Sequence, residues 1–296
     1  MTTPLLDLSN DLTRLANAHG ASVARIEGSQ HGASALVFSA DGVLIAPSHA
    51  IDEDGGLRVT LADGRTLDAT VVGRDPGSDL AVLRVDANDL SAPIFADAAD
   101  VHVASLALAL ARPGRTLRAA FGAVGVYGEG FRTRSGGKVD RWLQLDRSLP
   151  WGFSGAAVFD AHGRALGLAT PALLRRGSLI VPSETIRRVV AAILAHGKVP
   201  RGYLGVGVYP VRLPEAVATA HQTRAGVVLV AIEADGPAQQ AGLGIGDVLL
   251  SVDGESVEGP HQLSSVLSDR GGKSVTLKLL RNGATVEVSA NVGTRS

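Results

Sequence analysis

The sequence predicts a mostly β protein, with two six-stranded antiparallel barrels followed by a small α+β domain. Glycine is abundant, at 36 of 296 residues, and aromatic residues make up only 4%, a composition typical of turn-rich β proteins. Between residues 22 and 181 the chain alternates short apolar runs with turn residues, which indicates a sandwich or barrels. Residues 203–292 mix strand-like runs with short helical patterns and suggest a compact second unit.

The composition excludes several classes of protein. Hydrophobic residues make up 45% of the chain and charged residues 19%, enough apolar side chains for a packed core throughout. The net charge of -1 gives no indication of nucleic acid or of an anionic membrane as a partner. The absence of cysteine excludes disulfides, thiol catalysis and cysteine-based metal sites. No run of about 18 apolar residues occurs, so we expect no transmembrane helix.

The N-terminal segment predicts an amphipathic helix over residues 5–18. Leu5, Leu8, Leu12 and Leu15 recur at helical spacing, and Gly20 follows,. The apolar stripe is expected to pack on the body of the protein or on a neighbouring subunit. The first residues contain neither the basic nor the apolar region of a secretory signal. We therefore expect a cytoplasmic location as the sequence stands, and an extracytoplasmic one if a signal has been removed.

Twelve short strands are expected next, separated by turn signals such as Asp41-Gly42, Asp63-Gly64 and His162-Gly163,. Twelve strands in about 160 residues fit two six-stranded barrels. The expected strands are 22–27, 33–39, 43–46, 57–62, 66–72, 80–85, 101–110, 116–126, 142–146, 157–159, 165–169 and 178–181.

A helix over about 183–196 and a short linker lead to the second unit. Ile186, Val189, Val190, Ile193 and Leu194 form one apolar face, and His196-Gly197 ends the helix,. In the second unit we expect strands at 203–208, 226–232, 247–252, 274–281 and 285–292, with short helices at 213–221, 237–241 and 260–268.

The segment around Ser154 could carry a nucleophile. Gly152 precedes this serine by two residues, Gly155 follows it, and an apolar strand begins at Ala157. Flanking glycines let the chain turn sharply and bring backbone N–H groups close to a carbonyl, as an oxyanion hole requires. Alone, the pattern fits an ordinary turn at least as well.

Two further residues give the serine a context. His49 follows an apolar strand, and Asp79 lies between a turn and the apolar strand that begins at Leu80. Each by itself is explained by a structural role, but the chain order His49, Asp79, Ser154 is that of the chymotrypsin-type triad. An α/β-hydrolase requires the order Ser, acid, His and a helix after the serine, so that class is rejected. Metal-binding and nucleotide-binding motifs are missing, and no cofactor is expected.

The chain resembles the HtrA/DegP family of trypsin-like serine proteases with a C-terminal PDZ domain, and the likeness covers nearly all of it from Ser22 onward. The family's segments around the histidine and the aspartate are similar to residues 39–49 and 72–83. The PDZ signature is matched by Gly236-Pro237-Ala238, Gly246-Asp247-Val248-Leu249 and Val252-Asp253-Gly254. The resemblance implies a helix at 1–20, a protease domain at 21–198, a linker at 199–202 and a PDZ domain at 203–296.

The resemblance also implies an activity and a set of site residues. It suggests a serine endopeptidase acting on unfolded or damaged protein, with Ser154 as nucleophile, His49 as general base and acid, and Asp79 as the group that orients the histidine. Gly152 and Ser154 are the expected oxyanion-hole donors, with Phe153 as a further candidate from family geometry. A homotrimer, or a multiple of one, is the expected assembly.

Specificity is expected from two regions. Ser148, six residues before the nucleophile, is expected at the base of the specificity pocket, and the wall 166–170 is apolar, which favours small or medium aliphatic residues. In the PDZ domain, the loop of Tyr203, Leu204, Gly205 and Val206 is expected to bind a peptide C-terminus, and the helix 260–268 to line the groove with Leu263 and Leu267,.

The main departure from the family pattern follows the serine. The family motif is G-N-S-G-G-P, and this chain has Gly152-Phe153-Ser154-Gly155-Ala156-Ala157. If position 156 requires a positive φ, the methyl group of Ala156 strains the loop. The alternative hypotheses are therefore a degenerate protease that acts as a peptide-binding chaperone, and a scaffold assembled through the N-terminal helix.

Overall fold

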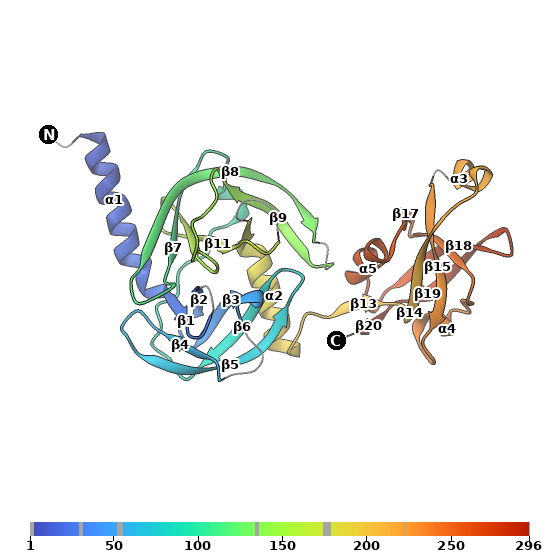
Figure 1. The fold of residues 1–296 in the computed structure, drawn as a ribbon, viewed down its shortest axis with the longest axis horizontal. Helices are drawn as coiled ribbons and strands as arrows, with labels where there is room; N and C mark the ends of the chain where they lie inside the picture. The colour runs from blue at the N-terminus through green and yellow to red at the C-terminus, as the bar shows by residue number, and fades with distance from the viewer. Residues whose placement is uncertain are drawn as a thin grey trace. The chain divides into compact units, whose positions relative to one another are not determined.

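The computed structural model describes residues 3–29, 32–51, 56–133, 136–173, 179–221 and 223–295. The chain divides into two units, residues 1–133 with 137–199, and residues 134–136 with 200–296. Figure 1 labels the elements along the chain. In the described ranges, no helix is long and apolar enough to cross a membrane.

The N-terminal helix α1 (Pro4–His19) lies on the surface of the first unit. Thr3 caps it through a hydrogen bond from the Leu6 N–H, and Pro4 occupies its first turn,. Although none of its residues is fully buried, Leu12, Leu15 and Ala16 pack against the main core. His19 stacks on Phe159 with ring centroids 4.7 Å apart. Of the predicted apolar stripe, Leu12 and Leu15 therefore pack on the body of the protein, whereas Leu5 is 79% exposed.

The first barrel closes in the order β1-β2-β3-β6-β5-β4. All its strand pairs are antiparallel. Its interior is filled by small and branched apolar side chains, including Leu44, Val59 and Leu83. Its strands are β1 (Val23–Ile26), β2 (Ala33–Ser39), β3 (Val43–Pro47), β4 (Arg58–Thr60), β5 (Thr66–Asp75) and β6 (Leu80–Val85).

The second barrel closes in the order β10-β11-β12-β9-β8-β7 and is also antiparallel. Its strands are β7 (Leu106–Ala111), β8 (Arg118–Arg132), β9 (Lys138–Leu145), β10 (Ala157–Asp160), β11 (Ala165–Thr170) and β12 (Leu179–Pro182). The prediction of two six-stranded antiparallel barrels is confirmed. The strand expected at 101–110 begins only at Leu106, because residues 103 and 104 form a turn in which Ala104 has φ +71° and the Ser105 N–H donates to the His102 carbonyl at 3.1 Å.

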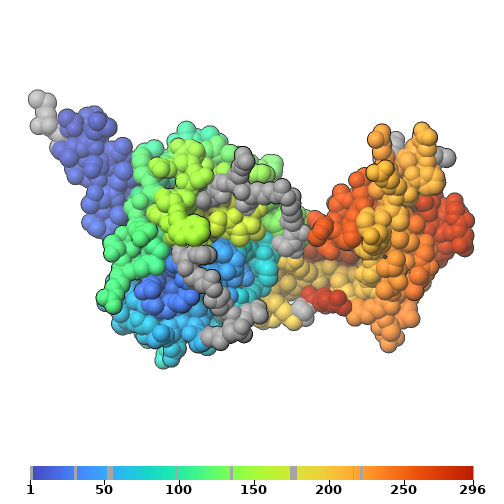
Figure 2. All heavy atoms as spheres, in the orientation of Figure 1, coloured from blue at the N-terminus to red at the C-terminus, as the bar shows by residue number. Residues whose placement is uncertain are grey.

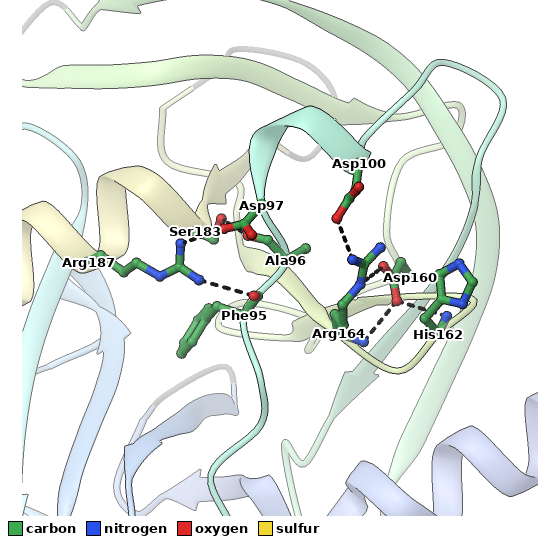
Figure 3. A network of polar contacts seen from close by, with 9 residues as sticks. All are labelled: Phe95, Ala96, Asp97, Asp100, Asp160, His162, Arg164, Ser183 and Arg187. Atoms are coloured by element: carbon green, nitrogen blue, oxygen red, sulfur yellow. Dashed lines mark hydrogen bonds and ion pairs between the residues drawn. The ribbon is translucent and has the colours of Figure 1, made fainter.

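A polar network fixes the connection between the barrels, as Figure 3 shows. Ser183, at the start of α2 (Ser183–His196), donates to the Ala96 carbonyl at 2.7 Å, and Arg187 donates to the Phe95 carbonyl at 3.1 Å. Arg164 pairs with Asp160 at 2.8 Å and also with Asp100. The connection is thus held against both the second barrel and the helix that follows it.

The second unit contains a sheet in the order β14-β15-β16-β18-β19, to which β17 is added beside β16, and a separate pair β13-β20. The strand expected at 203–208 is interrupted at Leu204 and Gly205, because Gly205 has φ +73°. The elements are β13 (Arg201–Tyr203), β14 (Val206–Arg212), α3 (Glu215–His221), β15 (Ala225–Ile232), α4 (Pro237–Gln240), β16 (Val248–Val252), β17 (Glu255–Ser256), α5 (Pro260–Ser268), β18 (Ser274–Arg281), β19 (Ala284–Asn291) and β20 (Gly293–Arg295).

Candidate active site

The first barrel brings His49 and Asp79 together. Strands β3 and β6 pair with Pro47 opposite Leu80, and just beyond that end of the ladder the Ser48 N–H donates to the Asp79 carbonyl at 3.0 Å, so that His49 follows directly beside Asp79. His49 Nδ1 lies 2.8 Å from Asp79 Oδ2, and the His49 backbone N–H donates to Asp79 Oδ1 at 3.0 Å. Both contacts fix the imidazole relative to the carboxylate.

The second barrel completes the environment of Asp79. Thr170, the last residue of β11, donates its hydroxyl hydrogen to Asp79 Oδ2. Asp79 is only 4% exposed and Thr170 is fully buried. A buried carboxylate needs such hydrogen bonds to offset its desolvation. From the sequence, Thr170 is expected in the wall of the specificity pocket, and this contact is not predicted. The signal that could have indicated it is a hydroxyl side chain at the end of an apolar strand.

Ser154 lies within hydrogen-bonding distance of the histidine. Its Oγ is 3.0 Å from His49 Nε2. The Ser154 carbonyl accepts from the Ser34 N–H at 3.0 Å, and the Gly155 N–H donates to the Ala169 carbonyl at 2.9 Å. Gly155 has φ +77°, and a β-carbon there would lie 1.9 Å from the Ser34 carbonyl oxygen, so only glycine fits. The structure therefore brings His49, Asp79 and Ser154 into one hydrogen-bonded series.

The segment before the serine is a tight turn, called here the 150–153 turn. The Phe153 N–H donates to the Pro150 carbonyl at 3.2 Å, and Gly152 has φ +87°, as a type II turn requires at its third residue. Among the described residues, the N–H groups of Gly152 and Ser154 have no hydrogen-bond partner. Phe153 differs from the expectation, because its N–H closes the turn and is not available to a substrate.

The positive φ that would strain the loop at Ala156 is absent. Ala156 is not among the residues with positive φ. It is fully buried, its N–H donates to the Phe153 carbonyl at 3.1 Å, and its carbonyl accepts from the Ala169 N–H at 2.8 Å. The methyl group is therefore accommodated in an ordinary conformation, and the steric argument for a collapsed loop fails.

A hollow of about 200 Å³ adjoins the serine. It differs from the expected pocket in two respects. Ser148 is exposed and is not among its lining residues, while Leu166 and Leu168 lie in the barrel cores. Within the described ranges, no group of three or more His, Cys, Asp or Glu residues is arranged to hold a metal ion. The residues around the hollow are Gly32, His49, Leu149, Pro150, Trp151, Gly152, Phe153, Ser154, Ala169, Thr170 and Pro171.

Comparisons with known proteins match both units. Residues 33–168 match the family model of the trypsin-like peptidase domain, and residues 228–281 that of the PDZ domain. A protein of Brucella suis biovar 1, named a probable periplasmic serine endoprotease DegP-like, is 30% identical over 88% of this chain and 52% of its own length. A relative of the same name from Halomonas elongata is 31% identical over 88% of this chain and 56% of its own length.

This chain is an HtrA/DegP-like protease homologue with a PDZ domain. It spans about half the length of the curated relatives it matches. The solved HtrA-type protease AlgW with a decapeptide aligns over 96% of this chain and 99% of its own, with 26% identity and a TM-score of 0.73. The same protease with a tripeptide gives 28% identity over 96% and 97% of the two chains and a TM-score of 0.69.

The PDZ domain of this HtrA-like chain presents a loop between β13 and β14. Tyr203 ends β13 and Val206 begins β14, an edge strand of the sheet. In the described part of the chain, the N–H groups of Leu204 and Gly205 have no hydrogen-bond partner. Two adjacent free donors beside an edge strand are suited to a peptide carboxylate.

The predicted groove lining differs from the structure. Leu263 and Leu267, on α5, are each 3% exposed and belong to the core of the PDZ domain. Little of either side chain is therefore open to a peptide in this structure. A charged pair that the sequence did not suggest lies beside the loop between β13 and β14. Arg295, in β20, bonds to Glu233 at 2.8 Å and lies 4.5 Å from the Tyr203 ring centroid.

Proposed function

We propose that this chain is a serine endopeptidase that cleaves unfolded or damaged protein through an acyl-enzyme intermediate. The observation that carries the proposal is the hydrogen-bonded series from Ser154 Oγ to His49 Nε2 at 3.0 Å and from His49 Nδ1 to Asp79 Oδ2 at 2.8 Å. A nucleophile, a base in contact with it and a carboxylate that orients the base are the elements of covalent hydrolysis.

In the acylation step, Ser154 Oγ attacks the carbonyl carbon of the scissile peptide, and His49 Nε2 takes the hydroxyl proton. The tetrahedral oxyanion is stabilised by the N–H groups of Gly152 and Ser154, which are free of other partners among the described residues,. The C–N bond then breaks, and His49 returns the proton to the leaving amine. The products of this step are a free amine and an ester on Ser154.

Deacylation repeats the same steps with water as the nucleophile. His49 takes a proton from water, the resulting hydroxide attacks the ester carbon, and the C–O bond to Ser154 breaks as His49 protonates Oγ. Asp79 keeps the Nδ1 proton directed toward itself and stabilises the imidazolium in both steps. No cofactor is required for either step.

The PDZ domain supplies the partner side of the proposal. We infer that Tyr203, Leu204, Gly205 and Val206 bind the C-terminal carboxylate of a peptide, which adds as a strand to β14. The solved HtrA-type relative AlgW was studied with a decapeptide and a tripeptide. A homotrimer, or a multiple of one, is the proposed assembly. The compartment stays a prediction, because "periplasmic" belongs to the names of the relatives.

The second hypothesis is a peptide-binding chaperone or scaffold without protease activity. It rests on Ala156 and Ala157, which replace the family's glycine and proline. The ordinary backbone of Ala156 removes its steric basis. Casein degradation by the purified protein, beside Ser154→Ala, distinguishes the two. We expect the parent protein to degrade casein and the variant to lose this activity, whereas equal degradation by both, or none by either, would overturn the protease assignment.

A further inference from the structure

The side chain of Arg112 is partly buried and binds main-chain carbonyl groups. Arg112 follows β7 at the edge of the second barrel. Its Nε donates to the Val23 carbonyl at 2.9 Å, one terminal nitrogen donates to the Gly20 carbonyl at 3.1 Å, and the other to the Arg115 carbonyl at 3.1 Å. No carboxylate among the described residues pairs with it. A planar guanidinium with a fixed set of donors suits three acceptors in different directions, and an ammonium does not.

The main chain of Arg112 is held as firmly as its side chain. Its N–H donates to Ser34 Oγ at 2.8 Å, and Ser34 is fully buried. The N–H of Ser34 in turn donates to the carbonyl of Ser154 at 3.0 Å. One buried serine of the first barrel thus contacts both the proposed nucleophile and Arg112.

The next residue, Pro113, fits between two glycines. A β-carbon on Gly152 would lie 3.2 Å from Pro113 Cβ, and one on Gly32 would lie 2.8 Å from the Pro113 carbonyl oxygen. Both glycines have positive φ, at +87° and +66°. The proline ring therefore packs closely against the main chain of the 150–153 turn, at the residue whose N–H is the proposed oxyanion donor.

Arg112 and Pro113 belong to the β7–β8 hairpin, the segment that connects these two paired strands. This hairpin also contacts the end of the N-terminal helix. A β-carbon on Gly20, directly after α1, would lie 2.8 Å from a methyl group of Leu117. The Gly20 carbonyl is also one of the acceptors of Arg112. Figure 1 shows the end of α1 beside the connection between β7 and β8. Arg112 thus links the end of α1 to Pro113 and, through it, to the 150–153 turn.

We propose that Arg112 is a positioning residue that, through Pro113, holds the 150–153 turn in the conformation that leaves the Gly152 N–H free. The inference rests on the proposed peptidase function and assigns to this arginine a role that no motif in the sequence marks. Without the three carbonyl contacts, the hairpin has less to hold Pro113 in place. The turn can then rotate its central peptide, which removes one oxyanion donor without touching the catalytic residues.

The test compares Arg112→Met, Arg112→Lys and a control, Arg84→Met. Arg84 lies on β6, outside the site, and its guanidinium donates to the main-chain carbonyl of Asp41 at 3.1 Å. Removing one oxyanion donor costs about 10²- to 10³-fold in kcat, so partial loss in Arg112→Met is expected to lower kcat about 10- to 100-fold, with KM changed less than about threefold. Arg112→Lys should recover part of this loss, and Arg84→Met should remain within about twofold of the parent.

A second measurement does not depend on catalysis. The chain has two tryptophans, so in a Trp142→Phe background Trp151 alone reports on the 150–153 turn. We expect lower fluorescence anisotropy of Trp151 in Arg112→Met than in its parent. If a parent protein neither cleaves peptides nor reacts with a fluorophosphonate, the peptidase function fails, and the anisotropy still tests the role of Arg112.

The inference is overturned if folded Arg112→Met keeps the anisotropy of its parent, or keeps the parent kcat in an active protein. If Arg112→Met does not fold, Arg112→Lys is measured in the same two ways against the same two criteria. Circular dichroism and the midpoint of urea unfolding establish the folded state of each variant before its kinetics are compared.

Discussion

The two halves of the site are held by different kinds of interaction. The carboxylate of Asp79 receives hydrogen bonds from the His49 main chain, the His49 ring and Thr170, and only 4% of the residue is exposed. The 150–153 turn is closed by the hydrogen bond from the Phe153 N–H to the Pro150 carbonyl, and Trp151 within it is 75% exposed. In the proposed reaction, proton transfer is therefore supported by a buried polar network, whereas oxyanion binding depends on a glycine conformation and on the packing of Pro113.

This difference indicates which parts of the proposed peptidase can be adjusted. A buried network with complete hydrogen bonding resists small displacements, because each lost bond leaves a desolvated charge. A surface turn supported mainly by packing can change conformation at lower cost. Figure 2 shows the atoms on the side viewed in Figure 1, where α1 (blue) stands out from the surface of the first unit. We expect substitutions in the Asp79 network to abolish the proposed peptidase activity, and substitutions around the 150–153 turn to lower kcat by smaller amounts.

The largest expected effect comes from Asp79→Asn. An asparagine preserves the shape of the side chain but offers His49 an amide, which favours the wrong imidazole tautomer. We expect kcat to fall about 10⁴-fold, with KM nearly unchanged. Steady-state kinetics on a peptide substrate measure the effect, and a loss smaller than about tenfold in the folded variant would separate Asp79 from the chemistry.

Gly152→Ala tests the other half of the comparison. A β-carbon at φ +87° is strained by about 1 kcal/mol, and here it would also lie 3.2 Å from Pro113. The turn is expected to change conformation, lowering kcat about 10²- to 10³-fold. Gly64→Ala is the matched control, since Gly64 has φ +92° with no atom near the added carbon. It should lose stability and keep its activity; an equal loss of kcat in both variants would contradict the account.

The fold class and the three proposed catalytic residues could be predicted from the sequence, whereas most of the contacts around those residues could not. Alternating runs and turn residues are local signals, so the two barrels and the pairing that joins His49 to Asp79 could be anticipated. Thr170 contacts Asp79, which lies 91 residues away in the chain. Arg112 contacts Ser34, 78 residues away, and also Val23 and Gly20. No local pattern marks such long-range contacts. The errors at Phe153 and Ser148 arose because family geometry does not specify which N–H closes a turn or which side chain faces a hollow.

The hollow beside Ser154 is expected to determine which residue is preferred before the scissile bond, and this effect is smaller. Leu149, Phe153, Ala169 and Pro171 surround it, the described residues that line it include no carboxylate, and an unpaired cation is costly to bury. We expect kcat/KM for small or medium aliphatic residues before the scissile bond to exceed that for arginine or lysine at least tenfold, roughly the effect of 1.4 kcal/mol. Product mapping of digested casein measures this preference, and products ending mainly in arginine or lysine would refute it.

The smallest effect is expected from Ala156→Gly. Because Ala156 already has an ordinary φ, glycine relieves no strain and adds freedom to the unfolded chain. We expect kcat within about threefold of the parent and a free energy of unfolding lower by about 0.5–1 kcal/mol. Urea unfolding and peptide kinetics check the two values. A tenfold rise in kcat would mean that the methyl group restrains the loop after all.

Labelling with a fluorophosphonate tests the central claim most directly, because only an activated serine forms the covalent adduct. The account predicts that the parent protein is labelled on Ser154, identified by peptide mass spectrometry, and that Ser154→Ala is not labelled. His49→Ala should react far more slowly, since no base then takes the Ser154 proton. A folded parent protein that remains unlabelled, or label that persists in Ser154→Ala, would contradict the assignment of Ser154 as the nucleophile.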